Sequence, residues 1–177
     1  IEGVTLTLNQ TTAGSENGKN SRIAITRDDG PANKVIQDFV AAYNNLLSTI
    51  TSQTKYDIDL KQGSALTGDA LPRRIQGDMR DAISLTLDKG EVRNLSKMGI
   101  TINPSTGVME LDQKKLDAAL KDNNADVASL FTGEKGIGQR LVDSTEIYLK
   151  KKDGLLAVTS DSITKSIKDI DKQMEVA

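Results

Sequence analysis

A long amphipathic segment between Pro31 and about Tyr56 places the strongest constraint on how this chain can fold. Its apolar residues recur every three or four positions, so in an α-helix they would lie along one side. They are Val35, Ile36, Phe39, Val40, Tyr43, Leu46, Leu47 and Ile50. This stripe is too wide for a two-stranded seam, so the helix needs partners on more than one flank. The segment is therefore predicted to be the central helix of a helical domain.

The residue types that are missing from the chain exclude much of the usual enzyme chemistry. Its 177 residues include no His, Cys or Trp, and only 3% are aromatic. The chain therefore lacks the common general base at neutral pH, the thiolate nucleophile and the usual zinc ligands. Asp28, Asp29 and Asp112 have ready structural uses in turns and helix caps, so they indicate no catalytic pair. We expect no enzyme, no cofactor and no metal site, and a carboxylate-dependent hydrolase is kept only as an alternative.

Two polar stretches have the outline of ligand-binding loops without the residues that such loops need. Residues 14–20 are one residue short of a phosphate-binding loop and lack the Ser or Thr that binds magnesium. Residues 57–68 begin with two closely spaced aspartates, but lack the Gly and the Glu that an EF-hand requires at its sixth and twelfth positions. The first stretch is interpreted as a hairpin loop and the second as a solvated connector.

Charge and hydropathy argue against two classes of partner. The formal net charge is −2, so nothing indicates binding to nucleic acid or to an anionic membrane. No apolar run approaches the roughly 20 residues that a membrane-spanning helix needs. The chain opens on Ile1 rather than Met, and we therefore expect an internal fragment of a longer protein.

The first 27 residues are predicted to form a β-hairpin. In residues 1–9, Val4, Leu6 and Leu8 alternate with threonines, which is typical of a half-buried strand. Residues 21–27 are predicted to form the second strand, and residues 11–20 the loop. A lone two-stranded hairpin is marginally stable in water. Either it packs on the helices or its other strands precede Ile1, and the second interpretation is favoured.

Further helical and hairpin patterns follow the central helix. Asp69 is a candidate N-cap for a second amphipathic helix, which the pattern extends toward Leu87 and ends at Gly90. The apolar residues of this helix are Leu71, Ile75, Met79, Ala82, Ile83 and Leu87. Residues 99–111 are the clearest hairpin. Ile100 and Ile102 share one face of its first strand, Met109 and Leu111 share a face of its second strand, and residues 103–107 make the turn.

Two more helices are predicted before residue 154. Asp112 is expected to cap the first of them, whose buried side is Leu116, Ala119 and Leu120. Asn123 and Asn124 are predicted to break it, with one short apolar turn after the break, formed by Val127, Leu130 and Phe131. The second helix is predicted over residues 136–152, with Lys150, Lys151 and Lys152 in its last turn and Gly154 as its stop. Its predicted inner residues are Ile137, Leu141, Tyr148 and Leu149.

The last segment carries a heptad pattern. Leu156, Ile163, Ile167, Ile170 and Met174 are separated by seven, four, three and four residues, which is an a/d repeat. These five residues are the candidate coiled-coil association site. Two interpretations remain open: the helix packs on its own domain, or it associates with a second copy or with a missing segment of the chain.

Several short segments resemble, in the same order, the C-terminal half of the bacterial flagellar filament cap proteins (hook-associated protein 2). They are IEGVTLTL (1–8), IQDFVAAYNNL (36–46), GD (68–69), RI (74–75), LSKMGI (95–100), GVMELD (107–112), LF (130–131) and GLL (154–156). No single segment is diagnostic. The ordered set spans nearly the whole chain, and this makes the resemblance specific.

The resemblance implies an α+β fold that is predominantly helical, divided into three parts. Residues 1–28 would be the terminal strands of a β-rich head (plate) domain. Residues 29–154 would form a helical leg domain with the hairpin 99–111 inserted. Residues 155–177 would start a C-terminal coiled-coil helix.

The resemblance also implies a structural assembly factor that caps the distal end of the flagellar filament and promotes flagellin folding and insertion. The protein would be exported by the flagellar type III pathway to the filament tip, outside the cell. Expected partners are further copies in a homo-oligomeric ring, flagellin, hook–filament junction proteins and an export chaperone, with no nucleic acid and no membrane. The alternative is a surface adhesion module for host glycans or proteins, which an apolar patch on the N-terminal strands would favour.

Overall fold

A computed structural model describes residues 27–176 of the chain. The predicted hairpin over residues 1–27 therefore lies outside the described residues, except for Arg27. The described part is predominantly helical, as predicted, and it contains two small antiparallel hairpins, of which only β3–β4 was predicted. Its elements are α1 (Gly30–Thr54), β1 (Tyr56–Asp57), β2 (Gln62–Gly63), α2 (Leu71–Ile83), the 3-10 helix η1 (Leu95–Met98), β3 (Ile100–Ile102), β4 (Met109–Leu111), α3 (Gln113–Thr132), α4 (Ile137–Leu149) and α5 (Leu155–Val176).

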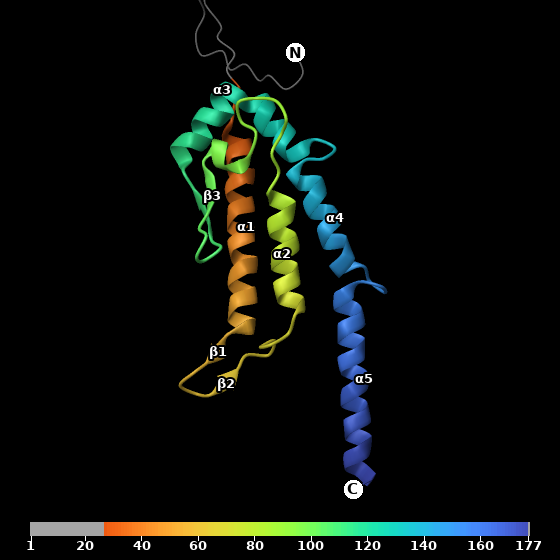
Figure 1. The fold of residues 1–177 in the computed structure, drawn as a ribbon. Helices are drawn as coiled ribbons and strands as arrows, with labels where there is room; N and C mark the ends of the chain where they lie inside the picture. The colour runs from red at the N-terminus through yellow and green to blue at the C-terminus, as the bar shows by residue number, and fades with distance from the viewer. Residues whose placement is uncertain (1–26, 177) are drawn as a thin grey trace, which may run out of the picture.

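Helix α1 is the central helix, as its apolar stripe predicted. It begins after a turn in which the Asp28 carboxylate accepts a hydrogen bond from the Gly30 N–H (2.9 Å), and Pro31 lies in its first turn. Helix α2 runs back alongside it, α3 crosses at its N-terminal end, and the β3–β4 hairpin packs on another side (Figure 1). The residues of α1 that these neighbours bury are Ile36, Val40, Tyr43 and Leu47.

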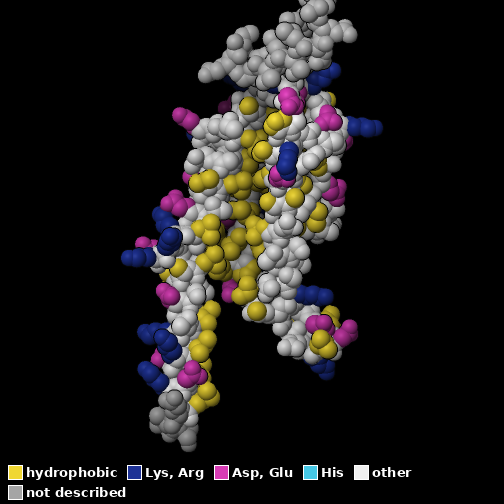
Figure 2. All heavy atoms as spheres, turned by 180° about the vertical axis from the view of Figure 1, so that it is seen from behind, with side chains coloured by type: hydrophobic (Ala, Val, Ile, Leu, Met, Phe, Trp, Pro, Cys, Tyr) yellow, Lys and Arg dark blue, Asp and Glu magenta, His cyan; other side chains and the backbone are white. Residues whose placement is uncertain are grey.

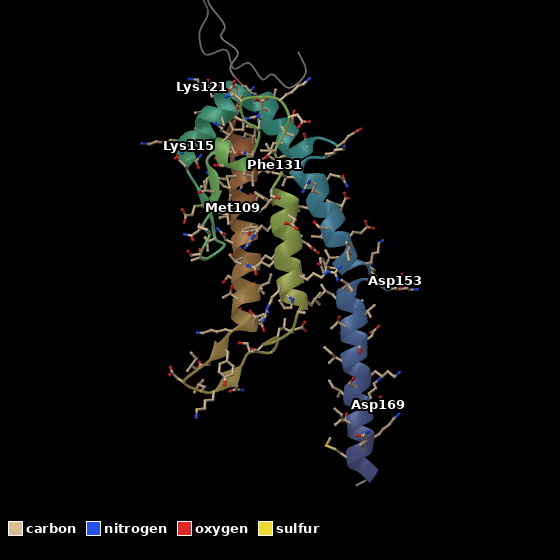
Figure 3. All side chains as sticks on the ribbon, viewed as in Figure 1. Met109, Lys115, Lys121, Phe131, Asp153 and Asp169 are labelled. Atoms are coloured by element: carbon tan, nitrogen blue, oxygen red, sulfur yellow. The ribbon has the colours of Figure 1, made fainter. Side chains whose placement is uncertain are left out.

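The β3–β4 hairpin is confirmed, and a side chain of α1 fixes its position. Ile100 pairs with Leu111 and Ile102 with Met109, so all four apolar residues lie on the same face of the two-stranded sheet. The Asn44 side-chain amide donates to the Met109 carbonyl and accepts from the Met109 N–H, both at 2.8 Å. Asn44 thereby acts like a neighbouring strand, and Figure 3 shows Met109 beside α1.

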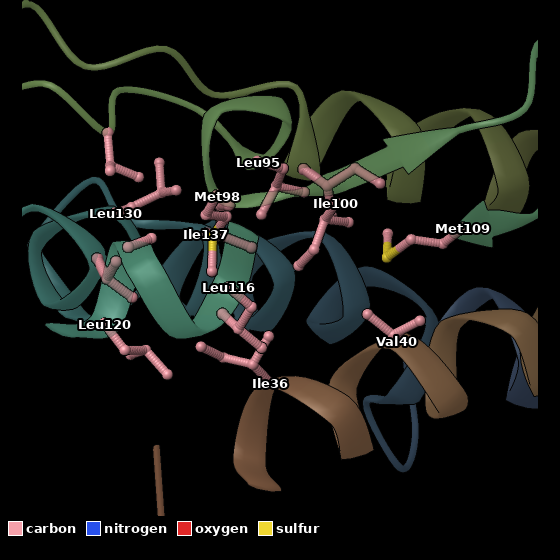
Figure 4. Close-up of a cluster of buried hydrophobic side chains, with 14 of the residues drawn as sticks. Ile36, Val40, Leu95, Met98, Ile100, Met109, Leu116, Leu120, Leu130 and Ile137 are labelled. Atoms are coloured by element: carbon pink, nitrogen blue, oxygen red, sulfur yellow. The ribbon is translucent and has the colours of Figure 1, made fainter. Parts of the chain in front are cut away.

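The core lies where α1, α3, α4, η1 and the β3–β4 hairpin meet (Figure 4). Its largest fully buried side chains are Met98, Ile100, Met109, Leu116, Leu120, Leu130 and Ile137. Gly99 has a φ of +94°, which favours glycine, and it connects η1 directly to β3. The Asp112 N–H donates to the Gly99 carbonyl (2.8 Å), so the start of α3 is joined to the hairpin at this point.

Helix α2 ends at Ile83, and its predicted extension to Leu87 is wrong. Arg140 of α4 explains where it ends. Its Nε donates to the Ala82 carbonyl (2.9 Å) and its Nη2 to the Asp81 carbonyl (2.6 Å), which satisfies carbonyl groups that a helix end leaves without a partner. At the other end of α2, Asp69 acts near the predicted cap position, since its carboxylate accepts from the Leu71 N–H (2.8 Å).

The predicted stop at Gly90 is also wrong, because this glycine has another use. Its φ is +100°, and the Asp126 carboxylate lies so close that a Cβ at this position would clash with it. The same carboxylate accepts hydrogen bonds from the N–H groups of Glu91 (2.8 Å) and Val92 (3.2 Å). Gly90 therefore lets the segment after α2 approach α3 closely.

In α3 the N-cap is confirmed and the break is milder than predicted. The Asp112 carboxylate accepts from the Lys115 N–H (3.2 Å). Asn123 has a non-helical φ of −133° and ψ of 35°, but the helix continues to Thr132 after this kink. The predicted buried residues Leu116, Ala119 and Leu120 before the kink are buried. So are Val127 and Leu130 after it, whereas Phe131 is partly buried.

Helix α4 is shorter than predicted, and one of its predicted inner residues is wrong. It ends at Leu149, so the three lysines follow the helix instead of forming its last turn. Ile137 and Tyr148 are buried, but Leu149 is 66% exposed. Leu149 lies about 120° around the helix from Ile137, whereas Tyr148 lies within about 20° of it. The sequence pattern grouped residues that the helical period separates.

Candidate association surface

Helix α5 presents the predicted heptad residues on one face and leaves them open. Leu156, Ile163, Ile167, Ile170 and Met174 are between 43% and 67% exposed within the described part of the chain. Figure 2 shows apolar side chains along the inner edge of α5 and charged side chains on its outer edge. We call these five residues the α5 stripe. Their role in association stays a prediction, because the structure contains a single chain.

A tight turn fixes where α5 leaves the body of the protein. Gly154 donates to the Lys150 carbonyl (2.9 Å), and Val158 donates to the Gly154 carbonyl (3.0 Å). A Cβ at Gly154 would clash with backbone atoms of Lys150 and Tyr148. The turn between α4 and α5 therefore needs a glycine at this position. Asp153, labelled in Figure 3, lies in this turn. As a result, α5 continues beyond the end of α4 and extends past the helices of the body (Figure 1).

Only the first part of the α5 stripe faces the body. Leu156 and Ile163 line one wall of a groove of about 330 Å³, and Ile50 and Ile75, from α1 and α2, line the opposite wall. Ile167 and the stripe residues that follow it do not line this groove. A helix placed against the whole stripe would thus contact α1 and α2 as well as α5.

A second apolar groove lies at the other end of α1. It has a volume of about 530 Å³ and is lined by residues of α1, α3 and α4, among them Val35, Phe39 and Leu141. The rings of Phe39 and Phe131 meet edge to face, with centroids 5.7 Å apart. Figure 2 shows apolar side chains along this side of the body and on toward α5. Val35, predicted as part of the buried stripe of α1, is mostly exposed here.

A polar contact holds α4, which carries α5, against α2. The Tyr148 hydroxyl donates a hydrogen bond to the Asp78 carboxylate. Burial raises the pKa of Tyr148 above its usual value of 10.0, and the hydrogen bond to Asp78 and the negative charge of Asp78 raise it further, against a smaller opposite effect of Arg74. Ionisation of Tyr148 would therefore weaken this contact.

This contact predicts how stability depends on alkaline pH. A raised pKa in the folded state means that the stabilisation is fully present below about pH 10 and is lost as the pH rises through the raised value. We expect the difference in free energy of unfolding between the native protein and Tyr148→Phe to be constant at neutral pH and to shrink above about pH 10. Denaturant unfolding of both proteins between about pH 8 and pH 12 measures this. A constant difference over the whole range would contradict it.

The described residues hold neither a metal cluster nor a membrane-spanning helix. Within residues 27–176, no group of three or more His, Cys, Asp or Glu side chains is arranged to hold a metal ion. None of the helices in that range combines the length and the apolar character that crossing a membrane requires.

Sequence reasoning missed a second exposed apolar feature. Residues 57–68, interpreted as a solvated connector, instead contain all of the β1–β2 hairpin except Tyr56. Each of the two strands has only two residues, which is too short for a strand period, and Ile58 and Leu60 lie in the turn between the strands.

Comparison with known proteins identifies the family. The family model described as "Flagellar hook-associated protein 2 C-terminus" matches residues 1–177, which is the whole chain. The chain belongs to this family. The B-type flagellar hook-associated protein 2 of Pseudomonas aeruginosa is 34% identical over 98% of the chain, and the match covers 36% of that relative. The flagellar hook-associated protein 2 of Salmonella typhimurium is 30% identical over 97% of the chain, and the match covers 37% of that relative.

A solved structure of a flagellar hook-associated protein 2 relative supports the same fold. The crystal structure of the flagellar cap protein FliD D1-D2-D3 domains from Escherichia coli superposes with a TM-score of 0.69 and 34% identity. The superposition covers 77% of this chain and 37% of that one. The chain thus spans a little over a third of the length of the curated relatives named above.

Proposed function

We propose that the parent protein caps the distal end of the bacterial flagellar filament and that this chain supplies its C-terminal part. The observation that carries the proposal is the match of the whole chain to a family of flagellar hook-associated proteins. On this proposal the protein is a structural assembly factor without an active site. It promotes the folding and insertion of arriving flagellin, and it reaches the filament tip through the flagellar type III export pathway.

The protein is proposed to have three parts that follow one another along the chain. Residues 1–28 contribute strands to a β-rich head domain, residues 29–154 form a leg, and residues 155–177 begin a coiled coil. Two features support the last boundary: the tight turn at Gly154 and the exposed stripe along α5. Proposed partners are further copies of the protein in a ring, flagellin, the hook–filament junction proteins and an export chaperone.

The α5 stripe is proposed as an association seam of the intact protein. Replacing Ile167 and Ile170 with Asp places two charges where apolar side chains would meet. We expect the mass of the full-length protein in solution, measured by light scattering, to fall toward that of the monomer. The control Lys165→Gln/Lys172→Gln changes the net charge by the same −2 on the opposite side of α5 and should leave the mass unchanged. An unchanged mass in the Asp variant would exclude the seam.

Disruption of the parent gene tests the capping function. We expect missing or stunted filaments, with unpolymerised flagellin accumulating in the growth medium, and recovery when the gene is restored. Normal filaments and no excess flagellin in the medium would contradict capping. The adhesion alternative depends on an apolar patch on residues 1–27, which lie outside the described residues except for Arg27, and it stays a prediction.

A further inference from the structure

A small cavity lies between α1 and α2, which run side by side (Figure 1). Its volume is about 10 Å³, and a cavity of roughly 10–15 Å³ is large enough to hold one water molecule. Helical spacing places its walls, because the residues that line it on each helix are separated by one, three or four positions. They are Tyr43, Leu46, Leu47 and Ile50 of α1 and Gln76 and Met79 of α2.

The Tyr43 hydroxyl is a buried polar group that the protein leaves without a hydrogen-bond partner. Tyr43 is only 9% exposed, and its hydroxyl oxygen is buried with no partner among the described residues. Buried polar groups nearly always bond to protein or to ordered water, because an unsatisfied group costs free energy. The other lining residues are apolar except Gln76, whose side-chain amide is the second strong hydrogen-bonding group at this cavity.

The other two tyrosines of the chain are in different surroundings. The Tyr148 hydroxyl is also in a buried residue, but it donates to the Asp78 carboxylate. Tyr56 is 51% exposed, so solvent can reach it. Of the three tyrosines, all of which the structure describes, Tyr43 is therefore the one whose hydroxyl needs a partner that the protein does not supply.

We propose that the cavity between α1 and α2 binds one water molecule, which links the Tyr43 hydroxyl to the Gln76 side-chain amide. The hydroxyl and the amide can each donate and accept, so a water molecule can hydrogen-bond to both. Two polar partners are sufficient for an ordered buried water. The water would join α1 to α2 across walls that are otherwise apolar.

The site also lies next to the candidate association surface. Ile50 lines both this cavity and the groove between α5 and the body. The water therefore supports the wall of α1 and α2 that the α5 stripe faces. Binding of this water does not depend on the proposed capping function.

Removal of the tyrosine hydroxyl tests the site in the full-length protein. Tyr43→Phe keeps the ring and removes the group that would bond to the water. We expect the equilibrium constant for unfolding to rise about twofold to tenfold, because a satisfied hydrogen bond contributes net stability. Tyr56→Phe makes the same change at a half-exposed residue and should leave the constant unchanged. Denaturant unfolding measures both. A Tyr43→Phe protein that is more stable than the native one would show that the hydroxyl is unsatisfied, and would overturn the proposal.

A second variant tests the link to Gln76. Gln76→Met keeps the length of the side chain and removes its amide. If one water joins the two residues, the double variant Tyr43→Phe/Gln76→Met should lose less stability than the sum of the two single losses. Additive losses would mean that Tyr43 and Gln76 share no partner.

A crystal structure of the full-length protein, at a resolution that shows ordered water, distinguishes the water from a direct contact. We expect a water molecule within hydrogen-bond distance of both the Tyr43 hydroxyl oxygen and the Gln76 amide. A direct hydrogen bond between the two side chains, or a cavity that holds no water, would overturn the proposal.

Discussion

Replacement of Leu116 by alanine is expected to lower the free energy of unfolding by about 2–5 kcal/mol. Leu116 is completely buried in the first half of α3, within the core that α3 forms with α1 and the β3–β4 hairpin. The truncation removes apolar contacts and leaves a cavity that the surrounding helices fill only in part. Since a typical domain is stable by only about 5–15 kcal/mol, this is a large fraction of the total. Denaturant unfolding followed by circular dichroism measures the change.

Leu149→Ala is the matched control for this prediction. It removes the same atoms from a side chain that is exposed at the end of α4, so it should change stability by less than about 0.5 kcal/mol. Equal losses of stability in the two variants would contradict the difference in burial between Leu116 and Leu149. A large loss in Leu149→Ala alone would mean that the C-terminal end of α4 is packed differently.

Replacement of Gly99 by alanine is expected to destabilise the protein through two separate effects. The φ of +94° costs an L-residue about 1–2 kcal/mol. In addition, a Cβ at this position would lie 2.7 Å from Lys115 Cβ and 2.8 Å from the Asp112 carbonyl oxygen. To relieve that clash, the hairpin and the start of α3 would have to move apart. The hydrogen bond from the Asp112 N–H to the Gly99 carbonyl opposes this movement. We expect a total loss of more than about 2 kcal/mol, measured by denaturant unfolding.

Gly68→Ala separates the two effects. Gly68 has a similar φ of +86°, but a Cβ added there would have no atom within 4 Å, so only the conformational cost applies. The loss in Gly68→Ala should therefore be clearly smaller than the loss in Gly99→Ala. Equal losses would show that the close approach of α3 to Gly99 contributes nothing.

Local periodicity was sufficient to predict the elements that depend on their own residues. Helix α1 and the α5 stripe were found because apolar residues recur at helical and heptad spacing, and the β3–β4 hairpin because two short apolar strands flank a turn. Two of the errors, the end of α2 and the role of Gly90, arose because residues far along the chain determine the local structure. Arg140 binds the carbonyls at the end of α2 from 58 residues away, and no pattern near Leu87 reveals this.

The sequence predicted one side of the candidate association surface but not the side that faces it. The heptad spacing identified the five residues of the α5 stripe, but the facing wall depends on α1 and α2, which lie about 100 residues earlier in the chain. The β1–β2 hairpin leaves little periodic signal in the sequence, because each of its strands has only two residues. The neighbouring aspartates favoured a solvated connector instead, and the structure shows Asp57 closing the turn.

The position of the parent protein on intact flagella tests the central claim most directly. This chain contains no cysteine, and Ser105 is exposed in the β3–β4 turn, where only its backbone N–H bonds to Asn103. Ser105→Cys, in a parent protein with any other cysteine replaced, allows a fluorescent label to be attached to cells that assemble normal filaments. Capping predicts one spot at the distal end of each filament. Label along the whole filament or at its base would contradict the account.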